Sequence, residues 1–80
     1  MGLDLRRAKG SMTEEAFDRA AARFKRMNEQ NLALARAYLL PPGILQVDIA
    51  QQNRISRQLV HKHCKKIFDA HCKIVAATSF

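Results

Sequence analysis

The feature that most constrains the fold is the middle of the chain, residues 46–66, with the sequence QVDIAQQNRISRQLVHKHCKK. Ile49 and Ala50 are expected on the inner face of a short helix. Ala50 is small enough to let a second helix cross it closely. Ile55 is an apolar residue in the turn that follows, and Ser56 has a hydroxyl of the type that caps a helix N-terminus. This pattern predicts a helix-turn-helix, the motif in which the second helix lies in the major groove of DNA.

The turn between the two helices is expected at residues 52–55. Asn53 adopts left-handed backbone angles at low cost, so we predict that it provides the left-handed residue of the turn. Arg54 occupies the position that is most often glycine in such motifs, and His63 occupies a position of the second helix where an aliphatic residue is usual. The alternative interpretation is an amphipathic helix pair with a solvated basic face.

The second helix is predicted to have a buried stripe and a polar outer face. Val60 and Cys64 continue the stripe at four-residue spacing. The outer face contains the hydrogen-bonding and cationic groups that base edges and phosphates require: Arg57, Gln58, His61, Lys62 and Lys65. Arg57 suits the paired acceptors of guanine, and Gln58 can bridge the donor and acceptor of adenine. We therefore expect this face to contact bases.

Phosphate contacts are expected beside this face. Gln46 and Ser56 lie at predicted helix N-termini, where backbone N–H groups and side chains typically hold phosphates. Arg54, Lys66 and Lys73 are expected to add attraction that does not depend on base sequence. Gln46 and Ser56 thus complete the predicted DNA-binding site.

The positive charge of the chain is concentrated in its last third. The formal net charge is +7, but residues 12–53 contain five basic and five acidic side chains, whereas residues 54–80 contain six basic side chains and one acid, Asp69. An excess confined to the predicted recognition helix and its continuation favours a polyanionic partner over general solubility.

A membrane-surface helix is the competing use of this charge. It would need bulky apolar residues opposite the basic face, and Leu59, Ile67 and Phe68 are available. Packing of these residues against the rest of the domain is the simpler explanation. No apolar run approaches the ~18 residues of a membrane-spanning helix, and no secretory signal is recognisable, so we expect a cytoplasmic protein without a membrane partner.

The whole chain predicts a small all-α domain of about four helices, with a long C-terminal recognition helix. The expected helices cover residues 14 to about 27, 29 to about 39, 46 to about 52, and roughly 20 residues after Ser56. Thr13 and Asn28 are the predicted N-caps of the first two helices. Two prolines followed by Gly43 end the second helix, and Tyr38 within it is predicted to be a core ring.

The N-terminus resembles an expression-tag remnant. Gly10 and Ser11 immediately before Met12 are similar to a cloning scar. We interpret residues 1–11 as such a remnant and residues 12–80 as the DNA-binding domain. A short natural basic arm is the alternative.

The long last helix is predicted to mediate a homodimer. A domain of 80 residues buries only ~60% of its unfolded surface, and the extension beyond the recognition segment adds the side chains of Ile67, Phe68, His71, Ile74 and Val75. The alternative is that the extension folds back over Phe17 and Phe24 of its own subunit.

Neither a disulfide nor a metal site is expected. Cys64 and Cys72 lie eight residues apart, which is ~12 Å along a continuous helix and too far for a disulfide. Reduced thiols suit a cytoplasmic protein. His61 with Cys64 could form half of a zinc site, but the other half is missing. We predict no metal and no cofactor.

No catalytic arrangement is recognisable either. The chain has no nucleophile with a base at motif spacing, no glycine-rich loop and no paired carboxylates. We therefore expect no enzymatic activity. The main alternative to a DNA-binding regulator is a small helical protein-interaction adaptor whose basic face binds an acidic protein.

The chain resembles the TrfB/KorA family of plasmid-encoded transcriptional repressors. The resemblance rests on TEEAF at 13–17, on ALARAYL at 33–39, and on 46–68, which includes ISRQLV at 55–60 and KIF at 66–68. Members of this family act as homodimers on palindromic operators and repress genes for plasmid maintenance and transfer. The resemblance implies the same role here, on plasmid or nucleoid DNA in a bacterial cytoplasm.

Overall fold

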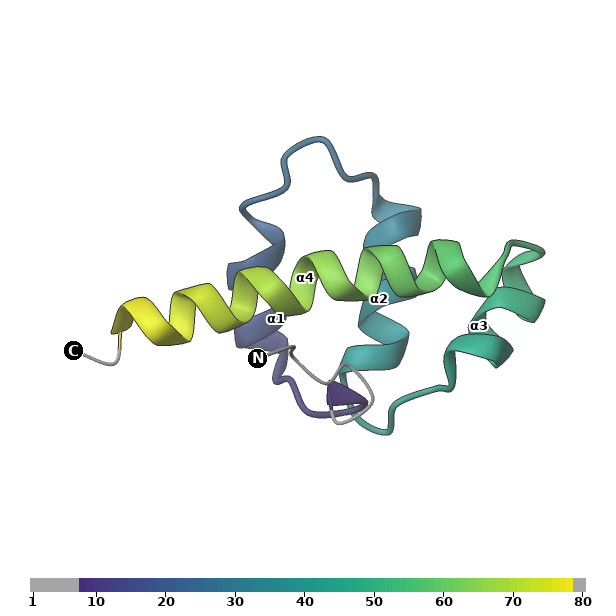
Figure 1. The fold of residues 1–80 in the computed structure, drawn as a ribbon, viewed down its shortest axis with the longest axis horizontal. Helices are drawn as coiled ribbons and strands as arrows, with labels where there is room; N and C mark the ends of the chain where they lie inside the picture. Colours follow the sequence, from purple (N-terminus) through teal and green to yellow (C-terminus); the bar gives the residue numbers. More distant parts are fainter. Residues whose placement is uncertain (1–7, 79–80) are drawn as a thin grey trace.

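The chain folds into four helices (Figure 1). A computed structural model describes residues 8–78 and contains α1 (Glu14–Ala21), α2 (Glu29–Leu39), α3 (Gln46–Asn53) and α4 (Arg57–Thr78). No strand occurs among these residues, so the prediction of an all-α domain of about four helices with a long last helix is confirmed. None of the helices in this part of the chain is long and apolar enough to cross a membrane.

Helix α4 packs against each of the other three helices. Figure 1 shows α4 along the longest dimension of the molecule, crossing α1 and α2, with α3 beside its N-terminal end. Side chains from all four helices are buried between them, among them Phe17, Leu39, Ile49, Val60 and Ile67. Tyr38 lies in the same core, as predicted. One face of α4 is thereby held by the rest of the domain.

The three helix N-caps predicted from the sequence are confirmed. The Thr13 hydroxyl accepts a hydrogen bond from the Ala16 amide at 3.2 Å, and the Asn28 side-chain oxygen accepts one from the Asn31 amide at 2.8 Å. The Ser56 hydroxyl accepts from the Leu59 amide at 3.2 Å, so α4 begins directly after Ser56. Each cap supplies an acceptor to an amide that has no partner within its helix.

Helix α1 is shorter than predicted. It was expected to reach about Met27, but it ends at Ala21. Beyond it the backbone forms tighter i→i+3 bonds, in which Phe24 donates to Ala21 at 2.9 Å and Met27 donates to Phe24 at 3.1 Å. These turns let the half-buried Phe24 and Met27 pack against the core while the chain reverses toward α2. Neither a glycine nor a proline lies at this end of α1, so the local sequence does not mark it. Packing of Phe24 and Met27 against the core determines it instead.

The left-handed residue of the turn is Arg54, and the prediction that Asn53 holds this conformation is wrong. Arg54 has φ 56° and ψ 42°. Asn53 stays in the last turn of α3, where its side-chain amide donates to the Ile49 carbonyl at 2.8 Å. Ile55 donates to the Ala50 carbonyl at 3.0 Å and Arg54 to that of Gln51 at 3.3 Å, the Schellman pattern that closes a helix around a left-handed residue.

The residues before α1 belong to the packed structure. Ala8 and Met12 are each 2% exposed, and the backbone amide of Met12 donates to the Leu39 carbonyl at 2.9 Å. Residues 1–11 were interpreted from the sequence as a tag remnant and had no part in the predicted fold. Residues 8–11 nevertheless pack on the end of α2, whatever their origin, and residues 1–7 lie outside the described residues.

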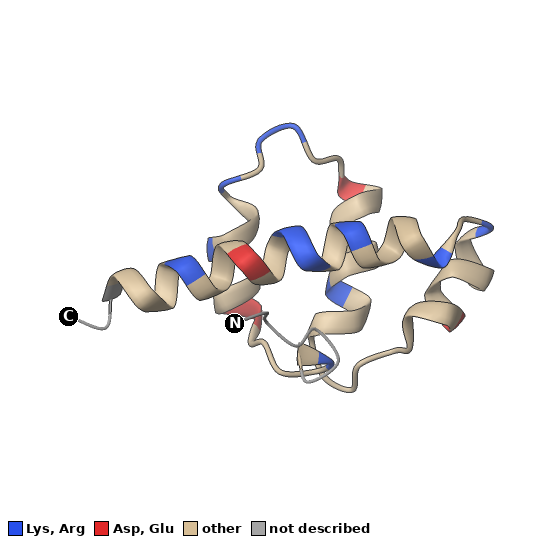
Figure 2. Cartoon of the chain, in the orientation of Figure 1, with Lys and Arg blue, Asp and Glu red and all other residues tan. Residues whose placement is uncertain are grey.

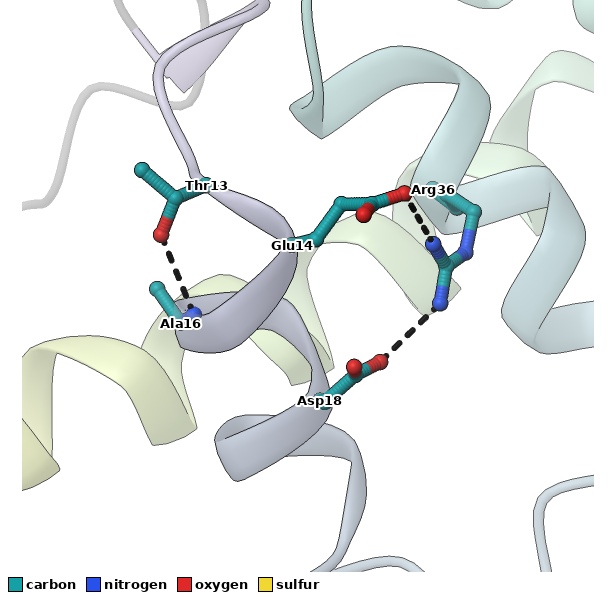
Figure 3. Close-up of polar contacts among 5 residues, drawn as sticks. All are labelled: Thr13, Glu14, Ala16, Asp18 and Arg36. Carbon is teal, nitrogen blue, oxygen red and sulfur yellow. Dashed lines mark hydrogen bonds and ion pairs between the residues drawn. The ribbon is translucent and has the colours of Figure 1, made fainter.

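A guanidinium joins α1 to α2 (Figure 3). Arg36 of α2 donates to the Asp18 carboxylate at 3.0 Å and lies 3.4 Å from that of Glu14. Its guanidinium carbon also lies 4.9 Å from the centre of the Phe17 ring. All three ionic groups are exposed enough that each pair contributes only about 0.2–1 kcal/mol. The contact orients the two helices more than it stabilises them.

Replacing Arg54 by glycine should stabilise the fold. Glycine adopts a φ of 56° without the Cβ strain that costs other residues ~1–2 kcal/mol, although it loses more chain entropy on folding, so Arg54→Gly should raise the free energy of unfolding by ~0.5–1 kcal/mol. Arg54→Ala is the matched control, since it removes the same charge and keeps the Cβ. Equal stabilities of the two variants in chemical denaturation would contradict the assignment of strain to this residue.

Candidate nucleic-acid interface

Helix α4 has a buried side and an exposed side. Val60, Cys64 and Ile67 are fully buried on the inner side. The residues predicted to contact bases are all exposed on the outer side: Arg57, Gln58, His61, Lys62 and Lys65. The structure therefore orients α4 as the sequence predicted, with its polar face directed away from the domain.

Part of this face borders a hollow of about 490 Å³ between α4 and the N-terminal end of α3, which we call the first hollow. The residues around it are Tyr38, Leu45, Gln46, Val47, Arg57, Gln58 and His61. Gln46 of α3 is thus brought beside the first two turns of α4. Lys62, Lys65 and Ser56 do not line the hollow. The Ser56 hydroxyl is engaged in capping α4.

The N-terminus of α3 has no side-chain cap. Leu45 occupies the N-cap position and provides no hydrogen bond, so the first amides of α3 depend on solvent or a ligand. The helix dipole places partial positive charge at the same end. Gln46 is half-buried there. The carboxylate of Asp48 lies in the same first turn and offsets this partial charge, so this end of α3 offers amide donors beside the first hollow without a net positive charge.

Cationic residues outnumber acidic ones along α4 (Figure 2). From Arg57 to Lys73 the helix contains five lysine and arginine residues and one acid, Asp69, which follows the predicted recognition segment. Asp48 of α3 is the nearest acidic residue in the sequence on the other side of the turn, and it is exposed. The outer face of α4 is thus electropositive in its first three turns, where base contacts were predicted.

A second basic hollow was not predicted from the sequence. It measures about 350 Å³ and lies between the α1–α2 loop, residues 22–28, and the other flank of α4. Its lining is Arg23, Phe24, Lys25, Arg26, Met27, Asn31, His63 and Lys66. Because α1 ends early, the loop approaches residues about forty positions later, and no local pattern indicates this.

His63 is the polar residue buried in α4. It is 9% exposed, and its Nδ1 has no hydrogen-bond partner among the described residues. Burial lowers the pKa of His63 below its ordinary value of 6.5, and the nearby Lys66 and Lys62 charges lower it further. The other charged groups around the second hollow, on the α1–α2 loop, are cations as well. His63 is therefore neutral at physiological pH.

The two cysteines behave as separate thiols. Cys64 is fully buried, and burial raises the pKa of its thiol to about 12, so it is unreactive. Cys72 is half-buried, and its pKa is raised by burial and then by Asp69. Both lie on the unbroken helix α4 and neither is in a disulfide. Within the described residues, no three His, Cys, Asp or Glu side chains are grouped to hold a metal.

The C-terminal half of α4 is partly covered by the rest of the chain. Ile67 is fully buried in the core that contains Phe17, and Phe68 and Ile74 are half-buried against it. Val75 is 47% exposed, and the His71 ring lies 6.3 Å from that of Phe68. Of the apolar surface expected to mediate a dimer, Ile67 is therefore used within the subunit, and the stripe from Phe68 to Val75 is partly exposed.

No family model, curated protein or solved structure matches this chain.

Protonation of His63 should destabilise the fold. The folded-state pKa lies below 6.5, so the unfolded chain binds the proton more readily. The contribution of the neutral His63 to the free energy of unfolding is complete above about pH 7. It is lost progressively as the pH falls toward the folded-state pKa. His63→Leu removes this group, so its melting temperature should fall less between about pH 7.5 and 5.5 than that of the wild type. His61→Gln, an exposed change on the same helix, should leave the pH dependence intact.

At neutral pH, His63→Leu should match or exceed the wild type in stability, by up to ~1 kcal/mol. A buried polar atom without a partner carries a desolvation penalty that an apolar side chain of similar size does not. If the melting temperature of His63→Leu depended on pH as that of the wild type does, His63 would be excluded as the origin of the pH dependence.

Proposed function

We propose that this chain is a sequence-specific DNA-binding transcriptional regulator whose helix α4 enters the major groove. One observation carries the proposal: α4 begins at the Ser56 cap directly after a tight turn, and it exposes the five residues predicted to contact bases while its opposite face is anchored in the core. A helix held by one face and polar on the other is what groove recognition requires.

The roles of the individual residues follow from their positions. Arg57 and Gln58 occupy the first turn of α4, which reaches base edges first, and their side chains suit guanine and adenine respectively. His61, Lys62 and Lys65 extend the same exposed face along the groove. Gln46, at the uncapped N-terminus of α3, is placed for a phosphate on the flank of the first hollow. Ser56 contributes by fixing the start of α4.

We further propose that the regulator acts as a homodimer on a palindromic operator and represses transcription by occupying a promoter. The partly exposed stripe from Phe68 to Val75 on α4 supports self-association at the end of the helix away from the turn. Two such subunits would present their recognition helices to successive grooves ~34 Å apart. The resemblance to plasmid-encoded TrfB/KorA repressors supports this mode, plasmid DNA as the target and a bacterial cytoplasm as the location. The proposed mechanism involves no catalysis.

A protein-interaction adaptor is the second candidate, and the first hollow favours it in one respect. Leu45 is 51% and Val47 44% exposed beside Tyr38, which gives the hollow an apolar wall. An acidic, partly apolar peptide could contact this wall and Arg57 together. DNA remains the better fit, because the positive charge continues along α4 well beyond the hollow.

A gel shift distinguishes the two candidates. The protein is titrated with the DNA upstream of its own gene and with a random duplex of equal length, at two salt concentrations. A salt-dependent shift that favours the upstream DNA supports the regulator. Equal affinity for both duplexes favours the adaptor.

Substitutions on α4 should separate base contacts from general attraction. Arg57→Ala should cost ~1–3 kcal/mol on the cognate site and relax the preference at one base position, because it removes a bidentate contact. Lys66→Ala should weaken binding to cognate and random duplexes alike. Fluorescence anisotropy with both duplexes measures the two effects. Equal losses on cognate and random DNA for both variants would contradict the assignment of Arg57 to a base.

Self-association should depend on the exposed apolar residue at the end of α4. Val75→Asp should shift the protein toward monomer in sedimentation equilibrium, because a carboxylate in an apolar contact loses its hydration without a partner. Ala76→Asp adds the same charge on the next, exposed position of the helix and should leave the association unchanged. A dimer that survives Val75→Asp must use another surface.

A further inference from the structure

The second hollow concentrates positive charge that nothing in the described residues neutralises. Arg23, Lys25 and Arg26 line it from the α1–α2 loop and Lys66 lines it from α4. None of these four cations forms an ion pair with a described carboxylate, and no acidic residue is part of the lining. Figure 2 shows lysine and arginine both in this loop and on the middle of α4. Like charges brought together in this way repel unless an anion lies between them.

Two polar side chains in the lining can direct hydrogen bonds to such an anion. His63 is nine-tenths buried, and its partnerless Nδ1 is closed off from the hollow, so Nε2 is the ring nitrogen left to donate to an anion. The half-buried Asn31 adds an amide group. The Lys66 ammonium lies 5.9 Å from the centre of the Phe24 ring, which holds this cation at the edge of the hollow. Charge and directed donors therefore converge from two elements.

We propose that the second hollow is an oxyanion site that binds a phosphate group. The four cations supply the attraction, and His63 and Asn31 supply oriented donors. A phosphate presents several strong acceptor oxygens and up to two negative charges, which match a site with many donors and no acceptor carboxylate. The ligand class is a phosphate ester, either a phosphodiester of a nucleic acid backbone or a free nucleotide.

The site is separate from the predicted base-contacting face. The first hollow is lined by Arg57, Gln58 and His61, whereas His63 and Lys66 point to the other flank of α4, because successive residues of a helix are 100° apart. Phosphate binding in the second hollow requires no sequence recognition by α4. The inference therefore goes beyond the proposed function and does not depend on it.

An NMR titration of the full chain tests the proposal. Inorganic phosphate and a nucleoside monophosphate are added separately at constant ionic strength, with chloride as the balancing ion. The expected result is a saturable shift of the His63 ring resonances and of the Asn31 side-chain amide. Absence of a saturable shift with both ligands would overturn the proposal.

Two double variants of equal charge provide the matched comparison. Lys25→Gln with Arg26→Gln removes two cations of the hollow and should weaken phosphate binding by about tenfold or more. Lys9→Gln with Arg19→Gln removes two exposed cations that do not line it, and should change binding by less than about twofold. Equal weakening of phosphate binding in the two double variants would show that only the net charge matters, and would overturn the proposed site. All four positions are exposed, so neither variant disturbs the core.

A random-sequence duplex identifies the source of the phosphate. A larger loss of duplex affinity in the hollow variant than in the control variant assigns the site to the DNA backbone. Equal duplex affinity, with phosphate binding lost only in the hollow variant, assigns it to a free nucleotide. Both results support the oxyanion site. Failure of the regulator proposal appears separately, as absence of selectivity for the upstream DNA.

Discussion

The burial of one face of α4 is the constraint on which the structure depends. Val60, Cys64 and Ile67 are completely enclosed by side chains of the other helices, and burying each such side chain contributes about 1.5–3 kcal/mol. An isolated helix of this composition would be only marginally stable in water. Packing therefore both stabilises the helix and determines which residues face solvent. Each α4 residue proposed to contact bases is exposed because the opposite face of the same helix is occupied by the core.

Features set by local sequence were predictable, and those set by tertiary contact were not. The caps at Thr13, Asn28 and Ser56 and the two-sided pattern of α4 follow from interactions within a few residues. The early end of α1 depends on packing of Phe24, which no local signal marks. The Arg36 contact with Asp18 spans eighteen residues and was equally hidden. The second hollow combines two such distant segments, so the sequence alone did not indicate it.

In the turn between α3 and α4, the left-handed position is not held by the residue that adopts left-handed backbone angles more easily. Asn53 tolerates left-handed angles better than Arg54, but its side chain caps a carbonyl of α3, and the Schellman closure then requires the next residue to be left-handed. His63 presents a similar conflict between stability and use. An apolar residue at that position would complete the core, whereas the imidazole leaves a buried nitrogen unsatisfied.

The continuity of α4 has a mechanical consequence. Its 22 residues form one rod of about 33 Å, since each residue adds 1.5 Å. A rod without a hinge transmits tilt from one end to the other. If two copies are joined near their C-termini, a change of 10° in their mutual angle shifts their opposite tips relative to each other by about 6 Å, nearly two base-pair steps of 3.4 Å. Small adjustments at the joint would therefore set the distance between the half-sites that the pair can span.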